Sequence, residues 1–189
     1  MDNKLKIINY LGKNLNQSFS MHELSKLIKI PYATFYRTIQ EMKDLIRMQN
    51  IGKSKIISLN TENPAVKSYL IISSDEEKKD FLKKHSIINK IASELQTKDT
   101  VILFGSYAKE NEKESSDIDM LIISKDGKKT ISFSKYEILF KKKINPIFIT
   151  KSEFRQMLKE KEENVGKQAL KKHIILQNPE NFWGCVLNG

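Results

Sequence analysis

The sequence contains few of the residues that cross-link a protein or anchor it in a membrane. It has one cysteine, Cys185, and three histidines among 189 residues. A single cysteine excludes a disulfide within the chain, and so few soft ligands do not build a zinc site. No apolar run approaches the roughly 20 residues that a membrane span requires, and the first residues lack a signal-peptide pattern. We therefore expect a cytoplasmic protein with no membrane partner.

The composition is that of a globular protein with an uneven distribution of charge. Apolar residues make up 39% of the chain and charged residues 30%, and the net charge is +10. Residues 1–70 contain 11 Lys or Arg and 5 Asp or Glu, whereas the rest of the chain contains 22 and 18. The first third is therefore the more basic part per residue, which is typical of a nucleic-acid-binding module.

Residues 1–60 predict three helices followed by a hairpin. Apolar residues from Leu5 to Leu11 recur at helical spacing, and Ser20 with Glu23 forms a capping box at the start of a second helix that ends near residue 28. A third helix is expected from about Tyr32 to Ile46, with apolar residues at spacings of four, three and four. Two short strands, 47–51 and 55–59, follow around a glycine-containing turn.

This part resembles the winged helix-turn-helix domains of bacteria and archaea. The resemblance lies in Glu23-Leu-Ser-Lys-Leu, in the turn near Ile30-Pro31 and in Thr34-Phe-Tyr-Arg. It implies DNA binding by the third helix and the hairpin, and a homodimer that reads symmetric sites. A protein-interaction or dimerisation domain of the same fold is the alternative. The implied DNA-binding residues are Tyr32, Thr34, Tyr36, Arg37, Gln40, Lys53 and Lys55.

Residues 63–98 predict a helical connector. One short helix is expected to end near Ile72, and a second is expected to begin at Ser73, because Ser74 and Glu77 have capping-box spacing. The second helix is predicted to continue to about Gln96. His85 lies on or beside its apolar stripe, and we expect this histidine to pack there and not to bind a ligand.

The most informative stretch lies between residues 101 and 123. An apolar strand is followed by Gly105-Ser106, a short polar helix, and a second strand that carries Asp117 and Asp119. Residues two apart on a strand share a face, so the two carboxylates repel unless a cation, most simply a divalent metal, lies between them. Free N–H groups at the start of the helix favour a phosphate. The pattern predicts nucleotidyl or phosphoryl transfer; the alternative is an ordinary strand–helix–strand unit with an acidic turn.

Phe104-Gly-Ser together with Ser116-Asp-Ile-Asp resembles the signature of the DNA polymerase β-type nucleotidyltransferases, in particular their minimal members. The resemblance implies that Asp117 and Asp119 are catalytic and bind Mg²⁺ or Mn²⁺. It also implies that a substrate hydroxyl attacks the α-phosphorus of a nucleoside triphosphate and that pyrophosphate leaves. The implied nucleotide-binding residues are Gly105, Ser106, Lys109 and Ser116.

The rest of the chain predicts a helix at about 130–142, a strand at 144–149, a helix from Ser152 capped by Thr150 and Glu153, and a last helix from Pro179. These elements suggest a small mixed sheet flanked by helices. Polymerase β-type enzymes usually carry a third carboxylate on the later strand, where this chain has Asn145. An asparagine cannot act as a base.

The predicted fold class is therefore α/β (α+β), with a winged helix-turn-helix domain at 1–62, a helical connector at 63–98 and a nucleotidyltransferase-like domain at 99–189. Two functions remain open. The first is a Mg²⁺-dependent transferase that moves a nucleoside monophosphate from an NTP to an acceptor and also binds DNA. The second is a DNA-binding regulator with little or no catalysis, whose transferase-like domain senses a nucleotide or dimerises.

Overall fold

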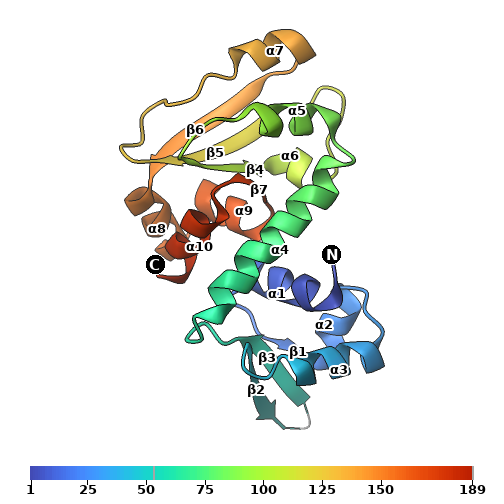
Figure 1. Ribbon diagram of the computed structural model, residues 1–189. Helices are drawn as coiled ribbons and strands as arrows, with labels where there is room; N and C mark the ends of the chain where they lie inside the picture. The colour runs from blue at the N-terminus through green and yellow to red at the C-terminus, as the bar shows by residue number, and fades with distance from the viewer. Residues whose placement is uncertain (53, 189) are drawn as a thin grey trace. The chain divides into compact units, whose positions relative to one another are not determined.

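The protein divides into two compact units, Met1–Ser73 and Ser74–Gly189 (Figure 1). Its computed structural model describes residues 1–52 and 54–188. The boundary falls inside helix α4 (Ala65–Leu82), which contributes residues to both units. Across the described ranges, no helix has both the length and the apolar character needed to cross a membrane.

The first unit combines helices with an antiparallel sheet. In the sheet of its described residues, β3 lies between β1 and β2 and pairs with both. The helices bury one apolar face each, which includes Ile8, Leu24 and Phe35. Its elements before α4 are α1 (Asn3–Lys13), β1 (Phe19–Ser20), α2 (Met21–Leu27), α3 (Tyr32–Glu41), β2 (Ile46–Ile51) and β3 (Ser54–Leu59).

The helices and hairpin strands occur where the sequence predicts them, but α3 is shorter than expected. It ends at Glu41, and Ile46 begins β2 opposite Leu59. The N–H of Met42 donates to the carbonyl of Ile39, which closes a final tight turn. Ile46 is buried all the same. The apolar spacing therefore identified a buried residue correctly but not its backbone conformation.

The second unit is built on a four-stranded mixed sheet in the order β6-β5-β4-β7. β5 and β6 are parallel, and the other pairs are antiparallel. The mixed sheet flanked by helices confirms the predicted architecture of this part. Its elements after α4 are α5 (Ser86–Glu94), β4 (Thr100–Phe104), α6 (Gly105–Ala108), β5 (Ile118–Ser124), α7 (Ser134–Phe140), β6 (Ile144–Thr150), α8 (Lys151–Lys159), α9 (Val165–Lys171), β7 (Ile174–Gln177) and α10 (Pro179–Leu187).

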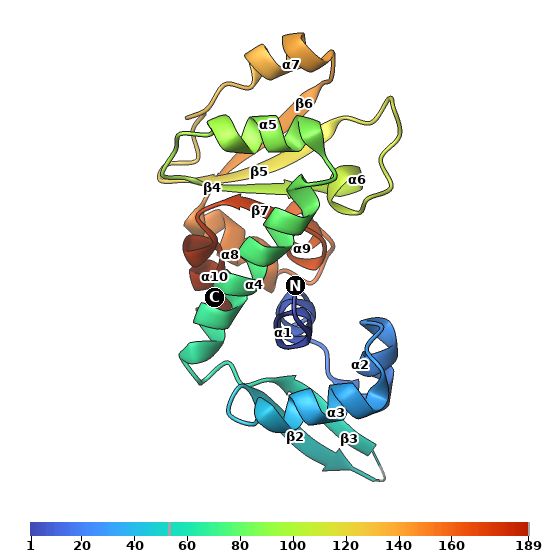
Figure 2. The same ribbon diagram turned by 45° about the vertical axis from the view of Figure 1, so that its right-hand side comes forward.

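Helices cover both faces of this sheet. Figures 1 and 2 show α5 on one side and α8, α9 and α10 on the other. On the α5 side, Ile88 and Ile91 join alternate strand residues such as Leu103 and Met120 in one buried cluster. On the other side, Trp183 is completely buried. With both faces covered, the polar groups of the sheet gather at its ends, where strands meet loops.

The predicted break at Ser73 is wrong. Helix α4 runs without interruption through Ser73 and Ser74, and both side chains are buried. The Ser73 hydroxyl donates to the carbonyl of Leu70, and the Ser74 hydroxyl accepts from the indole N–H of Trp183. Because tertiary and intrahelical partners satisfy these hydroxyls, neither one caps a new helix. The chain breaks later, between α4 and α5, where His85 precedes the first residue of α5.

The two other predicted capping boxes are confirmed. The Ser20 hydroxyl accepts from the N–H of Glu23, whose carboxylate accepts from the N–H of Ser20. Thr150 and Glu153 make the same reciprocal pair at the start of α8. The hydrogen bonds are local to each helix start. At α8, the backbone N–H and the hydroxyl of Thr150 donate to the Glu153 carboxylate and hold its pKa below the usual value.

Candidate functional site

Strand register brings three polar side chains together at one end of the sheet of the second unit. In the parallel pair β5–β6, Asp119 lies opposite Asn145. Asp117 lies just before the first residue of β5 and not within the strand as expected, two residues ahead of Asp119. The Asn145 amide donates to Oδ2 of Asp117 and to Oδ1 of Asp119, at 3.2 Å in each case. One amide thus contacts both carboxylates, so the two acids point to the same side.

Gly105 presses the turn after β4 against this carboxylate pair. In the antiparallel pair β4–β5, Phe104 lies opposite Asp119, which leaves Gly105 at the edge of the acid. Its φ of +71° is in the left-handed region, and a Cβ added there would lie 2.3 Å from Oδ2 of Asp119. Only glycine avoids both the strain and the collision. The backbone that leads into Ser106 therefore approaches the acid more closely than any side-chain-bearing residue allows.

A lysine that the sequence analysis did not select also lies at this site. The ammonium of Lys143 is 3.6 Å from Oδ2 of Asp117, and the two side chains are 69% and 40% exposed. A pair this exposed contributes little to stability. The signal for it was present, because Lys143 ends a run of three lysines just before β6. The parallel register of Ile118 with Ile144 then places Lys143 beside Asp117.

Ser116 and Lys109 lie on the segment that joins α6 to β5. The Ser116 hydroxyl accepts from the N–H of Lys113, and its own N–H donates to the carbonyl of Lys113. Ser116 therefore closes a turn just before Asp117. Lys109 caps the C-terminus of α6, and its side chain is exposed. Ser116 thus directly precedes Asp117 and has a structural hydrogen bond of its own, whereas Lys109 lies at the other end of the segment, next to α6.

The carboxylate pair and Asn145 fit a hard divalent cation in the nature of their donor atoms. Carboxylate and amide oxygens are ligands that Mg²⁺ prefers. The described residues contain no group of three or more His, Cys, Asp or Glu side chains that could hold a metal, so a third protein ligand at this site would have to be the amide. Asn145 now turns its N–H₂ group toward both acids. Its oxygen would face a cation after a half-turn of the amide.

The residues predicted to bind DNA lie on the first unit, where they differ in exposure. Tyr32 and Tyr36 on α3 are 47% and 38% exposed, and Arg37 is exposed. Thr34 and Gln40 are partly buried. The Lys55 ammonium lies 5.8 Å from the centre of the Tyr36 ring. Lys53 lies outside the described residues.

His22 belongs to the same surface and was not selected from the sequence. Its ring centre is 5.7 Å from that of Tyr32, in an edge-on arrangement. His22, Tyr32, Tyr36 and Lys55 help to line a shallow cavity of about 300 Å³ between α2, α3 and β3. The surface therefore presents aromatic edges and one cation, a set of groups that contacts sugars, bases and phosphates in nucleic-acid complexes.

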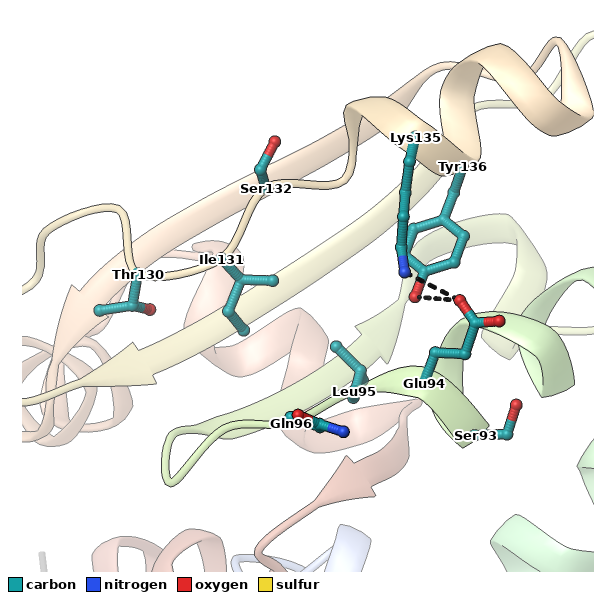
Figure 3. Close-up of a pocket in the computed structure, with 9 residues that line it drawn as sticks. All are labelled: Ser93, Glu94, Leu95, Gln96, Thr130, Ile131, Ser132, Lys135 and Tyr136. Carbon is teal, nitrogen blue, oxygen red and sulfur yellow. Dashed lines mark hydrogen bonds and ion pairs between the residues drawn. The ribbon is translucent and has the colours of Figure 1, made fainter.

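A larger cavity, of about 550 Å³, lies away from the carboxylate pair (Figure 3). None of its nine lining residues is a predicted site residue: Ser93, Glu94, Leu95, Gln96, Thr130, Ile131, Ser132, Lys135 and Tyr136. Figure 3 shows Lys135 and Tyr136 converging on Glu94. Their hydrogen bonds to its carboxylate connect α7 to α5. Hydrogen bonds from Lys90, Lys135 and Tyr136 lower the pKa of Glu94 to about 2. This acid is already well compensated.

A family model described as a nucleotidyltransferase domain matches residues 85–177. The match runs from His85 through β7 and includes Gly105, Ser106, Asp117, Asp119 and Asn145. It supports a nucleotidyltransferase domain in the second unit, which agrees with the mixed sheet and with the position of the carboxylate pair. No curated protein and no solved structure matches the chain.

Proposed function

We propose that the protein transfers a nucleoside monophosphate from an NTP to an acceptor, with Mg²⁺ or Mn²⁺, and that its first unit binds DNA. The observation that carries the transferase proposal is the contact of Gly105 with Asp119, because it sets a phosphate-binding turn against a metal-binding carboxylate. The family match to residues 85–177 supports the same reaction class. The single cysteine, which is buried, suits the reducing cytoplasm that we propose as its location.

The residues of the second unit divide the proposed work among them. Backbone N–H groups at Gly105 and Ser106 grip the terminal phosphates, and Lys109 offsets part of their charge. Asp117 and Asp119 would hold the metal ion, which supplies charge neutralisation and alignment of the phosphates. Asn145 orients both carboxylates through its amide. Holding the triphosphate in line with an acceptor hydroxyl is the main contribution of such a site.

The missing third acid limits the chemistry. In this reaction the attacking hydroxyl must lose its proton, and an amide such as Asn145 cannot accept it. The proton must therefore pass to water or to a group that the acceptor supplies. General-base catalysis typically contributes about 10² to 10⁴ in rate. We accordingly propose slow turnover unless the acceptor brings its own base.

The test is nucleotide binding followed by nucleotide transfer. We would titrate the wild type with each of ATP, GTP, CTP and UTP in the presence and absence of Mg²⁺, and then assay transfer of an α-³²P label to protein, RNA and small-molecule acceptors. Asp117→Ala/Asp119→Ala should abolish Mg²⁺-dependent binding. Glu162→Ala/Glu180→Ala, which removes the same charge from exposed positions, should bind as the wild type does. Failure of the wild type to bind any of the four nucleotides sinks the proposal.

We propose that the first unit is a winged helix-turn-helix domain and that it binds DNA as a homodimer. The order of helices and strands supports this proposal, as do the exposed Arg37 and Lys55 near the aromatic side chains of α3. Duplex binding that weakens steeply with salt would agree with phosphate contacts. Arg37→Ala should weaken it, whereas Lys67→Ala, a lysine of the same unit outside α3 and β3, should have a smaller effect. A response that is flat in salt contradicts the proposal.

A nucleotide-sensing regulator is the second candidate, and Asn145 and Lys143 favour it. They contact the carboxylates through a neutral amide and a distant, exposed ammonium, without a third acid. Such a site retains ligand binding and loses a proton acceptor. Binding that depends on Mg²⁺ and on Asp117 and Asp119, with no label transferred to any acceptor, would select the regulator over the enzyme.

A further inference from the structure

His85 occupies a junction that the proposed mechanism does not use. It precedes the first residue of α5, in the short connection after α4. Its ring stacks on that of Phe81, with 3.9 Å between ring centres and 16° between planes. Its side chain is only 14% exposed. The packing that the sequence predicts for His85 is therefore present, but it involves one face of the ring and leaves the two nitrogens for other partners.

Both ring nitrogens face carboxylates of the segment 109–117, which we call the site loop. Nδ1 lies 3.3 Å from a carboxylate oxygen of Glu112, and Nε2 lies 3.7 Å from one of Glu110. The neighbouring Lys84 reaches the same oxygen of Glu110 at 3.3 Å. Nε2 is buried and, among the described residues, has no hydrogen-bond partner. A proton on Nε2 would turn this approach into an ion pair.

The site loop links the two halves of the proposed nucleotide site. It begins directly after the Gly105-Ser106 helix and ends at Asp117, so a shift of the loop moves the phosphate cradle relative to the carboxylates. Glu110 sits in the left-handed region with φ of 53°, which costs a non-glycine residue free energy. Lys142 holds the far part of the loop through the carbonyl of Glu114.

The loop also has room to move. A cavity of about 310 Å³ separates its middle from the start of α5, and it is lined in part by His85, Tyr107, Glu112 and Lys142. A segment that borders a cavity this size is not fixed by close packing alone. Its position therefore depends on the polar contacts that Lys84, His85 and Lys142 make across the gap.

Charge makes those contacts matter for an anionic ligand. The ten residues from 110 to 119 include five carboxylates, and a triphosphate bound beside them would be repelled. Lys84 pairs with Glu110, and a protonated His85 would face both Glu110 and Glu112. Burial raises the pKa of Glu110, but the hydrogen bond from Lys84 and the nearby charges of Lys84 and His85 outweigh burial, so the pKa is lower than usual. The charged groups that face His85 or share its cavity are Lys84, Glu110, Glu112, Lys113, Glu114 and Lys142.

We infer that His85 is a positioning residue for the nucleotide site: its protonated ring holds Glu110 and Glu112 of the site loop against α5, and nucleotide binding weakens when the ring loses its proton. The inference rests on the proposed function, because it concerns the same site. The cation favours the held loop by pairing with two carboxylates. The neutral ring retains at most one N–H donor for them.

The test compares the pH dependence of nucleotide binding in two proteins. The dissociation constant of the tightest-binding NTP with Mg²⁺ is measured from pH 5.5 to 8.5 for the wild type and for His85→Gln, which keeps an amide donor but does not titrate. The ratio of the two constants removes the titration of the nucleotide itself. We expect the advantage of the wild type to be about three- to fivefold at pH 5.5, the size of one partly exposed ion pair, and to disappear by pH 8.5.

Two further variants guard against a folding artefact. Glu112→Gln removes the carboxylate partner without touching the Phe81 stack, and it should flatten the pH profile in the same way. Lys83→Gln alters an exposed charge on the same connection, whose partner is Asp80 and not the loop, so it should keep the profile of the wild type. Wild-type and His85→Gln constants that stay in a fixed ratio at every pH overturn the inference and leave the proposed function intact.

Hydrogen exchange of the free protein separates the inference from the proposed function. Peptides that cover 109–117 should exchange faster at pH 8.5 than at pH 5.5, after correction for intrinsic rates. His85→Gln should show no such difference. If the wild type binds no nucleotide at any pH, the proposed function fails and exchange alone decides whether His85 holds the loop. If exchange in the wild type does not depend on pH in this way, the inference that His85 holds the site loop is refuted.

Discussion

Two acidic sites in the second unit, Glu94 and the pair Asp117 and Asp119, have their negative charge compensated in very different ways. Glu94 receives Lys90 at 2.5 Å, Lys135 at 2.9 Å and the Tyr136 hydroxyl at 3.1 Å, beside the larger cavity. Asp117 and Asp119 share one neutral amide, and the ammonium of Lys143 is 3.6 Å from Asp117. Glu94 therefore has little uncompensated negative charge with which to attract a further cation. The pair Asp117 and Asp119 has an excess of negative charge, and a metal ion would neutralise that excess.

This difference shows that the volume of a cavity and the uncompensated charge that would attract a ligand are separate properties. The cavity beside Glu94 is large because α5 and the segment before α7 leave a gap, while their side chains satisfy one another across it. The carboxylate pair is compact because Gly105 brings backbone into contact with Asp119. Unbalanced charge, and not volume, marks the candidate site.

The largest expected effect comes from Gly105→Ala. The new methyl group would collide with Asp119, 2.3 Å away, and would hold alanine at φ of +71°. Strain and overpacking together should lower the free energy of unfolding by about 2–4 kcal/mol and abolish nucleotide binding. Chemical denaturation and nucleotide titration measure the two effects. Gly127→Ala is the matched control, because its φ is +72° but its nearest contact is a methyl carbon at 3.3 Å. Equal losses in both variants would contradict the role of the close approach.

The second-largest effect is expected for Asn145→Asp, which should change both the stability of the protein and its affinity for Mg²⁺. A third acid within 3.2 Å of two others adds repulsion, so we expect a loss of about 1–3 kcal/mol in unfolding free energy without metal. Mg²⁺ should restore this loss, and its affinity should rise at least tenfold, about 1.4 kcal/mol. Thermal denaturation with and without Mg²⁺ tests both statements. Asn145→Leu, which removes the amide without adding charge, should not raise the Mg²⁺ affinity above that of the wild type. Indifference of Asn145→Asp to Mg²⁺ would show that no cation binds here.

Glu94→Gln should affect stability in acid while leaving the candidate site alone. Because the pKa of Glu94 in the folded protein is about 2, well below the ordinary value of 4.5 for a glutamate, its charge stabilises the fold above pH 4.5. That contribution is lost as the pH falls from 4.5 through 2. The melting temperatures of wild type and variant should therefore differ at pH 6 and converge near pH 2. Nucleotide affinity should not change. A loss of affinity as large as that of Asp117→Ala/Asp119→Ala would contradict the distinction between the two acidic sites.

The smallest expected effect is that of Lys143→Gln. Its ion pair with Asp117 is long and exposed, so we expect stability to change by no more than about 0.5 kcal/mol. Removal of a competing cation should raise Mg²⁺ affinity about twofold in low salt, and the gain should vanish in high salt. Calorimetric Mg²⁺ titrations at two salt concentrations measure it. A large loss of affinity would instead make Lys143 part of the binding site.

Local signals in the sequence predicted local structure well. The capping boxes of Ser20 and Thr150 are present, because their partners lie three residues away and need no other part of the chain. Ser74 has the same spacing to Glu77 and caps nothing, because the indole of Trp183, more than a hundred residues later, uses its hydroxyl. The end of α3 shows the same limit, since pairing of Ile46 with Leu59 decides it.

The candidate site divides along the same line. Alternation along one strand was enough to place Asp117 and Asp119 on one face, and the strand that carries Asn145 could be named from its apolar run. That Asn145 donates to both acids, that Lys143 lies beside Asp117 and that His85 faces Glu110 and Glu112 follow from strand register and helix placement. Register depends on contacts between distant segments, and no short motif records it.

The sequence by itself determined most of the helices and strands, the pairing of a glycine turn with two aspartates, and the amide in place of a third acid. Those features depend on neighbours within a few residues, through backbone propensity and side-chain alternation. Only the tertiary structure decided which charges are compensated. Electrostatic balance depends on separations of a few ångströms between segments far apart in the chain, and packing of the sheet and its helices sets those separations.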